Sequence, residues 1–351
     1  MTMNNIDPVL RSDLERICEI FPHWEALAGK SVLITGASGL VGSMLVRTLC
    51  AAPVEIAVIA HVRNEQKARA MFGNLPISYC VGDVTAPICY EGAVDYILHT
   101  ASVTASKAFV TQPVETLMTA IDGTKNLLEF ARQKQVRGMV YVSSMEAYGI
   151  TDPNLERITE KDLGYIDILS VRSSYSEGKR ICECLCAAYA AEYGVPVKIA
   201  RLAQTFGAGV SFDDGRVFAQ FTKSCLAGTD IVLHTAGKSM GNYCYTADAV
   251  RGLLTVLLKG ENANAYTVAN PATAMQIREV AKLVSDTLTD GKTKIIFDIP
   301  ESALTYGYAP DVTMRLRADK LMALGWQPEV DLPEMFRRLA ASFRHQKGEC
   351  L

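Results

Sequence analysis

The spacing of apolar residues changes near residue 30 and divides the chain into a helical start and a longer alternating body. Before this point the apolar residues recur with a period close to 3.6, which predicts an amphipathic helix. They are Val9, Leu10, Leu14, Ile17, Cys18 and Phe21. After it, short apolar runs alternate with longer amphipathic segments. The runs predict strands near 31–35, 55–62, 77–81, 94–99, 138–143 and 195–201, and the segments predict helices near 43–52, 64–72, 113–134 and 175–193.

Such alternation is typical of the α/β class, with a doubly wound parallel sheet (a Rossmann body) covered by helices on both faces. The regular order ends near Gln204, in a stretch rich in glycine and aspartate. Beyond it the pattern predicts helices near 216–227, 247–259 and 275–288, and strands near 230–234 and 265–268. We therefore expect a helical extension over 1–29, a dinucleotide-binding domain over 30–203 with returns at about 242–270, and a smaller α/β substrate-binding domain over 204–241 and 271–351.

Composition and charge narrow the classes of partner. Of the 351 residues, 49% are hydrophobic and 21% are charged, which excludes a disordered or collagen-like chain. The formal net charge is −3 and no block of Lys and Arg is visible, so nucleic acid and membrane surfaces are not expected partners. No apolar run approaches the roughly 18 residues that span a bilayer, and the charges near the start do not fit a signal peptide. We expect a cytoplasmic protein that acts on a small molecule.

The ten cysteines are scattered and lie mostly in apolar segments, which is typical of reduced core residues. Only Cys182, Cys184 and Cys186 are clustered. Residues two apart in a helix point to different faces, and no histidine is nearby, so we expect no metal site.

A glycine-rich segment, Thr35-Gly-Ala-Ser-Gly-Leu-Val-Gly42, lies between the first predicted strand of the body and its first helix. Glycines there let the backbone approach a pyrophosphate, and the free N–H groups and dipole of the helix favour the anion. A tight turn without a ligand is the simpler alternative for this segment alone. The expected dinucleotide contacts are Gly36, Ser38, Gly39, Leu40 and Gly42.

Later strand ends bear on the choice of dinucleotide. Asp83 and Val84 follow the third strand of the body, where Asp can accept a hydrogen bond from an adenine amino group; a turn-forming Asp is the alternative. The turn after the second strand has no carboxylate for a ribose 2′-hydroxyl and carries Arg63, which leaves NADP open. The nicotinamide side is expected to be lined by the residues after the fourth strand, namely Thr100, Ala101 and Ser102.

Tyr175 and Lys179 lie one turn apart on one face of a predicted helix. An ammonium group beside a phenol stabilises the phenolate and lowers its pKa from about 10, which creates a general base for a hydroxyl proton. The preceding strand ends in Ser143-Ser-Met-Glu-Ala-Tyr-Gly149, at the edge where such sheets bind ligands. Here Ser144 can hydrogen-bond the reacting oxygen, and Glu146 offers a carboxylate beside it.

These motifs in this order resemble the signature of the extended short-chain dehydrogenase/reductase family of NAD-dependent epimerases and dehydratases, over about residues 30 to 335. The matching segments are TGASGLVG, GDV, HTAS, VSSMEAYG, YSEGK and RLAQTFGAG. Within the family, the runs 144–146, 177–180 and 214–221 are most similar to UDP-glucuronate decarboxylases and nucleotide-sugar dehydratases.

The resemblance implies a nucleoside-diphosphate sugar as substrate and a retained NAD that is regenerated in each cycle. Tyr175 would take the C4 hydroxyl proton as hydride leaves C4, with Ser144 orienting the oxygen and Lys179 holding the cofactor. The 4-keto sugar would then lose carbon dioxide, lose water with help from Glu146, or be reduced on its other face. A homodimer through a helix pair is also implied. Substrate contacts are expected from Thr104, Ser144, Met145, Gln204, Arg216 and Tyr245.

The chain departs from the family pattern at three places. Met145 stands where dehydratases usually carry the Asp that protonates a leaving hydroxyl, so strict dehydration is disfavoured. The segment 240–242 lacks an Arg that decarboxylases and many relatives carry, and Lys238 or Arg216 are candidate replacements. The Asn expected shortly before Gly123 is Ala120. We infer an altered substrate, with decarboxylation favoured.

Two other functions stay open at this point. An NADPH-dependent ketone or aldehyde reductase of the same fold is favoured by Arg63 and the missing strand-end carboxylate. A non-catalytic dinucleotide-binding protein is the third, and the presence of Ser144, Tyr175 and Lys179 argues against it. Tight retention of a dinucleotide would favour the nucleotide-sugar enzyme, whereas consumption of external NADPH would favour the reductase.

Overall fold

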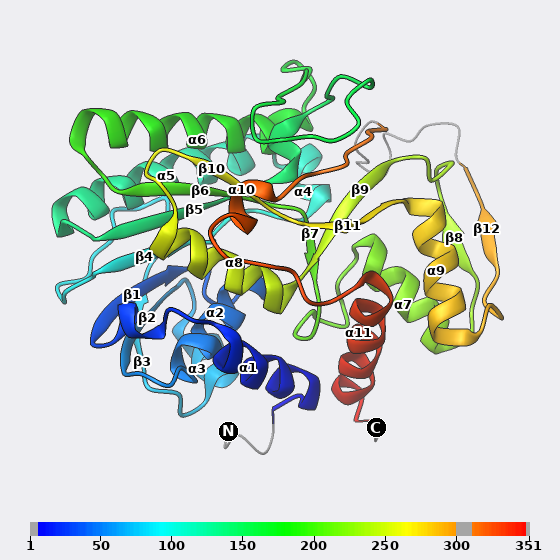
Figure 1. Cartoon of the computed structure of the whole chain (residues 1–351), viewed down its shortest axis with the longest axis horizontal. Helices are drawn as coiled ribbons and strands as arrows, with labels where there is room; N and C mark the ends of the chain where they lie inside the picture. Colours follow the sequence, from blue (N-terminus) through cyan, green and yellow to red (C-terminus); the bar gives the residue numbers. More distant parts are fainter. Residues whose placement is uncertain (1–5, 300–310, 349–351) are drawn as a thin grey trace.

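The computed structural model describes residues 6–299 and 311–348. Its centre is a parallel sheet with the strand order β10-β6-β5-β4-β1-β2-β3 (Figure 1). The strands are β1 (Lys30–Thr35), β2 (Ile56–Val62), β3 (Ile77–Val81), β4 (Tyr96–His99), β5 (Gly138–Ser144), β6 (Val197–Leu202) and β10 (Ala265–Val268). The order reverses between β1 and β4, so their carboxyl ends form the crevice in which doubly wound sheets bind ligands.

Helices cover both faces of this sheet because successive strand residues are apolar and point to opposite sides. Leu33 and Met139 pack on the side of α5 and α6, whereas Val32 and Val140 pack on the side of α2 and α8. Figure 1 shows α5 and α6 across the sheet from α2 and α3. The bounds are α2 (Leu40–Cys50), α3 (Glu65–Phe72), α5 (Pro113–Lys134), α6 (Ser173–Tyr193) and α8 (Thr246–Lys259).

A smaller lobe lies beside the carboxyl ends of the strands (Figure 1). It contains a sheet of order β11-β9-β7, in which β9 is antiparallel to β11 and parallel to β7, and a parallel pair of β8 and β12. Its elements are β7 (Gln204–Phe206), α7 (Val217–Ala227), β8 (Ile231–Leu233), β9 (Met240–Tyr245), β11 (Asn270–Gln276), α9 (Ile277–Thr289), β12 (Ile295–Phe297) and α11 (Leu332–Gln346). Short helices elsewhere are 24–27, α4 (Ser106–Thr111), 145–148 and α10 (Asp319–Met322).

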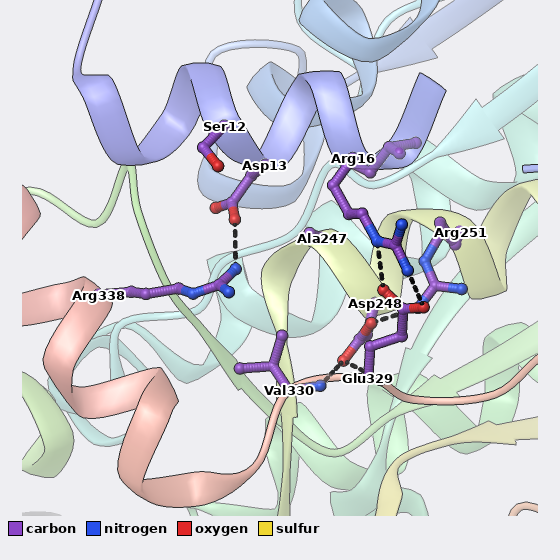
Figure 2. A pocket seen from close by; sticks show the side chains of 10 residues that line it. Ser12, Asp13, Arg16, Ala247, Asp248, Arg251, Glu329, Val330 and Arg338 are labelled. Atoms are coloured by element: carbon purple, nitrogen blue, oxygen red, sulfur yellow. Dashed lines mark hydrogen bonds and ion pairs between the residues drawn. The ribbon is translucent and has the colours of Figure 1, made fainter. Parts of the chain in front are cut away.

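The N-terminal helix α1 (Pro8–Ile20) joins the two lobes. It packs against α2 and α8 of the main body and against α11 of the smaller lobe. Asp13 is buried in this contact and accepts hydrogen bonds from the Tyr245 hydroxyl at 2.6 Å and from Nη1 of Arg338 at 2.9 Å. One turn further on, Arg16 bonds both carboxylate oxygens of Glu329, at 2.9 and 3.0 Å. Figure 2 shows α1 above these partners.

A cavity of about 220 Å³ lies between α1, α8 and α11 (Figure 2). The guanidinium groups of Arg16, Arg251 and Arg338 all reach it, and each is paired with a carboxylate. Because these charges balance, the cavity is an internal ion-pair cluster and carries no chemistry of its own. Its lining residues are Ser12, Asp13, Arg16, Ile17, Ala247, Asp248, Arg251, Glu329, Val330 and Arg338.

The predicted fold class is confirmed, and helix 113–134 and strands 77–81 and 265–268 have the predicted bounds. The pattern missed α4, β7, β11, β12, α10 and α11. In the predicted return segment 242–270, β10 is an edge strand of the main sheet and α8 packs on that sheet, whereas β9 belongs to the smaller lobe. The proposed domain bounds stay a prediction, and their parts at 1–5, 300–310 and 349–351 lie outside the described residues.

The described residues contain neither a membrane-spanning helix nor a metal-binding cluster. Over residues 6–299 and 311–348, no helix is long and apolar enough to cross a membrane. In the same ranges, no three His, Cys, Asp or Glu side chains are grouped so as to hold a metal ion. Cys182 and Cys186 point into the core and Cys184 is exposed, as expected for residues on different faces of one helix.

Candidate active site

The glycine-rich turn after β1 touches the loop after β4. Gly36 has φ +63°, and a Cβ placed on it would lie 2.7 Å from the backbone nitrogen of Ala101. A Cβ on Gly42 would collide with the carbonyl oxygen of Gly36. Both positions therefore require glycine, and the turn runs close to the start of α2.

The start of α2 is open to an anion. Gly39 is its N-cap and supplies no side-chain hydrogen bond, so the first N–H groups of the helix have no capping side chain. Ser38 and Gly39 are exposed, and Leu40 is half-buried. An uncapped helix start preceded by glycines fits the pyrophosphate of a dinucleotide.

Hydrogen bonds hold the loop after β4 against β1. The Thr100 hydroxyl donates to the carbonyl of Thr35 at 2.6 Å, and the N–H of Ala101 donates to the Thr35 hydroxyl at 3.3 Å. Burial lowers the pKa of His99, beside Thr35, to about 3, so this imidazole stays neutral. Ser102 bonds only within its own loop in the contacts described, to the carbonyl of Val103 at 3.2 Å. The structure thus places Thr100 and Ala101 beside the end of β1, and their contact with a nicotinamide stays a prediction.

At the adenine end, Asp83 and Arg63 lie side by side. Nη1 of Arg63 is 3.8 Å from Oδ2 of Asp83, and the Arg63 side chain is 82% exposed. Thr85 donates two hydrogen bonds to Oδ1 of Asp83, and these bonds lower the pKa of Asp83. Val84 is buried below this turn. The ionised Asp83 keeps an oxygen for a ligand, and Arg63 stands in solvent where a 2′-phosphate could reach it.

Ser144 and Tyr175 meet at the carboxyl end of β5. Ser144 ends the strand, and its hydroxyl accepts a hydrogen bond from the N–H of Glu146 at 3.2 Å, so it caps the short helix 145–148. The Ser144 side chain also acts to lower the pKa of the Tyr175 phenol. The two hydroxyl groups therefore lie at the same edge of the sheet, where the charge of Glu146 also acts on the phenol.

The electrostatics of Tyr175 differ from the sequence expectation. Its pKa is raised to about 12, first by burial and then by the charge of Glu146, while Ser144, Arg172 and Arg216 act to lower it. In the protein alone, burial and Glu146 thus outweigh the lowering of this pKa that the position of Lys179 had led us to expect. Burial lowers the pKa of Lys179 itself to about 8, and its ammonium donates to the carbonyl of Val142 at 2.9 Å. Its Nζ lies 5.6 Å from the centre of the Tyr175 ring.

Sequence reasoning missed two residues that shape this site. Arg172 makes two hydrogen bonds to Glu146, at 2.8 and 3.0 Å. The ring of Phe109 stacks on Tyr175 with centroids 4.3 Å apart and an interplanar angle of 10°. Arg172 precedes Tyr175 by three residues, a spacing that places both on one side of the helix start, so the helical pattern could have indicated it. Phe109 lies in α4, which the pattern did not predict.

The predicted substrate residues fall into two groups. Arg216 lies near enough to Tyr175 for its charge to act on the phenol, and it bonds the carboxylate of Asp214 at 2.6 Å. Met145 is half-buried, and its Cε would be 3.5 Å from a Cβ on Gly241. Thr104 and Gln204 are exposed. Their accessibility is compatible with a ligand contact, which stays a prediction.

Tyr245 requires a correction. Its side chain is fully buried, and its hydroxyl donates to Asp13 in the N-terminal helix. The hydroxyl is therefore engaged at the contact between α1 and α11 and does not reach the Ser144–Tyr175 pair. The sequence could not show this because the two partners are 232 positions apart.

The chain matches the family described as "NAD dependent epimerase/dehydratase family" over residues 32–270. Among curated proteins, it is 30% identical to UDP-glucuronic acid decarboxylase 6 of Arabidopsis thaliana, with 90% of each chain covered. It is 32% identical to UDP-glucuronic acid decarboxylase 2 of the same plant, covering 91% of this chain and 69% of the relative.

Solved structures share the fold. A UDP-glucose 4-epimerase of Thermotoga maritima with UDP-glucose superposes with a TM-score of 0.75 at 22% identity, over 91% of this chain and all of the neighbour. A dTDP-glucose 4,6-dehydratase of Streptomyces venezuelae with NAD has a TM-score of 0.75 at 23% identity, over 91% of this chain and 98% of the neighbour. The helix α1 precedes the segment that matches the family.

Proposed function

This chain belongs to the NAD dependent epimerase/dehydratase family, and we propose that it oxidises a UDP-sugar at C4 with a retained NAD and favours decarboxylation of a UDP-uronate such as UDP-glucuronate. The observation that carries this proposal is the grouping of Ser144 and Tyr175, whose side chains interact, with the buried Lys179, whose Nζ lies 5.6 Å from the centre of the Tyr175 ring. The similarity to UDP-glucuronic acid decarboxylases over nine-tenths of the chain supports the choice of substrate.

The chain's residues fit the cofactor that the family description names. Gly36 and Gly42 leave no room for a Cβ, and the uncapped start of α2 would hold the pyrophosphate. Asp83 would bind the adenine side and Thr100 and Ala101 the nicotinamide side. When bound, NAD supplies a hydride acceptor that also returns the hydride.

Tyr175 and Ser144 have different roles in moving the proton of the C4 hydroxyl. Tyr175, as its phenolate, takes the proton of the C4 hydroxyl while Ser144 donates a hydrogen bond to the same oxygen. Because the pKa of Tyr175 is raised to about 12 in the protein alone, a positive charge in the complete site must stabilise the phenolate. Lys179, whose Nζ lies 5.6 Å from the centre of the Tyr175 ring, would provide it together with the positive charge that NAD would supply when bound.

Once C4 is a ketone, the bond between C5 and the carboxylate of the same sugar is weakened. That bond breaks with release of carbon dioxide, its electron pair passes into the enolate of the C4 ketone, and C5 is then protonated. Met145 beside Glu146 supports this branch over dehydration, since a thioether cannot protonate a leaving hydroxyl. Arg216 is the proposed diphosphate contact, because a guanidinium matches phosphate oxygens and this one faces Tyr175.

One observation favours a second candidate, an NADPH-dependent carbonyl reductase. Arg63 is exposed at the end of β2, where no carboxylate is present to bind a ribose 2′-hydroxyl. The reductase would consume external NADPH with each turnover, which the retained-cofactor enzyme would not do.

We also propose a homodimer through α5 and α6. Large apolar side chains are exposed on these two helices, namely Val114, Met118 and Ile181. Burying such side chains in a second copy would remove them from water. Light scattering of the purified protein tests this: a monomer mass at micromolar concentration contradicts it. A cytoplasmic location likewise stays a prediction.

Product analysis tests the proposed function. The purified protein is incubated, without added cofactor, with UDP-glucuronate and with UDP-, dTDP-, GDP- and CDP-hexoses, and products are identified by mass spectrometry and NMR. We expect loss of carbon dioxide from UDP-glucuronate. A product of unchanged mass or loss of water would assign another branch, and turnover of a keto sugar only with added NADPH would favour the reductase.

A further inference from the structure

The carboxylate of Glu146 is held by three hydrogen bonds. Arg172 donates to its two oxygens at 2.8 and 3.0 Å, and the Ser176 hydroxyl donates to Oε2 at 3.0 Å. The side chains of Arg172 and Glu146 are only 15% and 25% exposed, so solvent screens their ion pair less than a surface pair. A guanidinium that grips both oxygens fixes the plane of the carboxylate as well as its position.

The same arginine reaches Tyr175 through an aromatic ring. Its guanidinium carbon lies 5.6 Å from the centre of the Phe109 ring, and Phe109 stacks on Tyr175 at 4.3 Å. Phe109 is 2% exposed, and its carbonyl accepts a hydrogen bond from the Ser174 hydroxyl. The phenol of the proposed base is therefore packed against a ring that Arg172 covers from another side.

We propose that Arg172 is a positioning residue of this site: it holds Glu146 as a fixed anion beside Ser144 and braces the Tyr175 ring through Phe109. This inference rests on the proposed function, since it concerns the same base. Without Arg172, the Glu146 carboxylate would face Tyr175 uncompensated and would keep only the bond from Ser176 among the three that hold it. It would oppose formation of the phenolate and repel a substrate that carries its own carboxylate.

The charges around Tyr175 define the test. Glu146 raises its pKa, whereas Arg172 and Arg216 lower it; Lys179 lies near its ring. We expect Arg172→Met to lower kcat by about 10²-fold, because misplaced catalytic groups cost that order of rate. The limb of the pH–rate profile that reports Tyr175 should move to higher pH by roughly one pH unit. Adding Glu146→Gln to Arg172→Met should move this limb back toward lower pH, because it removes the carboxylate that raises the pKa of Tyr175.

Two control variants accompany this test. Arg172→Lys keeps the positive charge but lacks the planar guanidinium that bonds both oxygens, so it should retain the wild-type limb while losing rate. Arg69→Met removes an exposed guanidinium that is paired with Glu65 in α3, and it should change neither rate nor limb. If Arg172→Met lowers kcat but leaves the limb in place, or if the double variant shifts the limb as far as Arg172→Met alone, the proposal is overturned.

A measurement without substrate separates this proposal from the proposed function. The holoenzyme and its Arg172→Met variant are each titrated by tyrosinate absorbance against their own Tyr175→Phe derivatives. Tyr175 should ionise at higher pH in Arg172→Met, because the Glu146 carboxylate beside it has lost its cation. Equal titrations would overturn the role of Arg172. Different titrations in a protein that turns over no UDP-sugar would overturn the proposed function alone.

Discussion

Replacing Asp13 by Asn tests how the N-terminal helix is held between the lobes. Asp13 is 1% exposed and accepts hydrogen bonds from Tyr245 and Arg338 (Figure 2 shows the bond from Arg338). Burial raises its pKa to about 6, although both partners act to lower it. Asparagine has nearly the same shape and keeps an oxygen that can accept the bond from Tyr245, but it does not titrate.

The direction in which pH changes the stability contributed by Asp13 follows from its raised pKa. A carboxyl group with a higher pKa in the folded protein than in the unfolded chain is stabilised by folding in its protonated form. This stabilisation is complete below the unfolded pKa and is lost as the pH rises through the folded pKa. The pKa rises from 3.8 to about 6, a difference of about 2 that corresponds to about 3 kcal/mol at 1.36 kcal/mol per unit.

The assay is urea unfolding of the wild type and of Asp13→Asn over a range of pH. As the pH rises from about 4 to about 7, the free energy of unfolding of the variant minus that of the wild type should increase by about 3 kcal/mol. Other carboxyl groups titrate in both proteins and cancel in the difference. As a control, Asp286→Asn, at an exposed ion pair with Lys282, should show a nearly constant difference. A constant difference for Asp13→Asn as well would refute the reasoning.

Three further predictions concern the site. Tyr175→Phe should keep fold and bound dinucleotide and lose about 10²–10⁴-fold in turnover, measured by product formation; a rate near wild type would remove Tyr175 from the mechanism. Gly36 has φ +63°, and a Cβ there would displace the backbone of Ala101. We therefore expect Gly36→Ala to lose the dinucleotide that the wild type retains through purification, measured by the absorbance of the supernatant after the protein is denatured; full retention would contradict a role of this turn in binding the dinucleotide. Arg63→Ala should weaken binding of NADP more than binding of NAD in calorimetry, and equal effects would exclude Arg63 as a 2′-phosphate contact.

Much of the main sheet could be predicted from the sequence because its elements are encoded locally. A buried parallel strand reads as a short apolar run, and α5 combines a regular amphipathic pattern with Pro113 at its start and basic residues in its last turn. The motifs at Gly36, Ser144 and Tyr175 sit where the order of strands brings them together, so their proximity follows once the sheet is assumed. The structure agrees with this placement.

The smaller lobe and the electrostatics of the site could not be predicted in the same way. Strand β7 has only three residues, and its pairing with β9 depends on contacts between distant segments. Tyr245 looked like a ligand contact, yet its partner Asp13 lies in another part of the chain. The pKa of Tyr175 depends on burial and on Glu146 and Arg172, which no spacing rule combines.

The most direct test of the proposed function is release of carbon dioxide from UDP-glucuronate by the purified protein with only the dinucleotide that it retains. We predict one carbon dioxide for each UDP-pentose formed, many turnovers for each bound dinucleotide, and almost no release by Tyr175→Phe. If UDP-glucuronate is bound but no carbon dioxide is released, or if release requires one added NAD for each product, the central claim is contradicted.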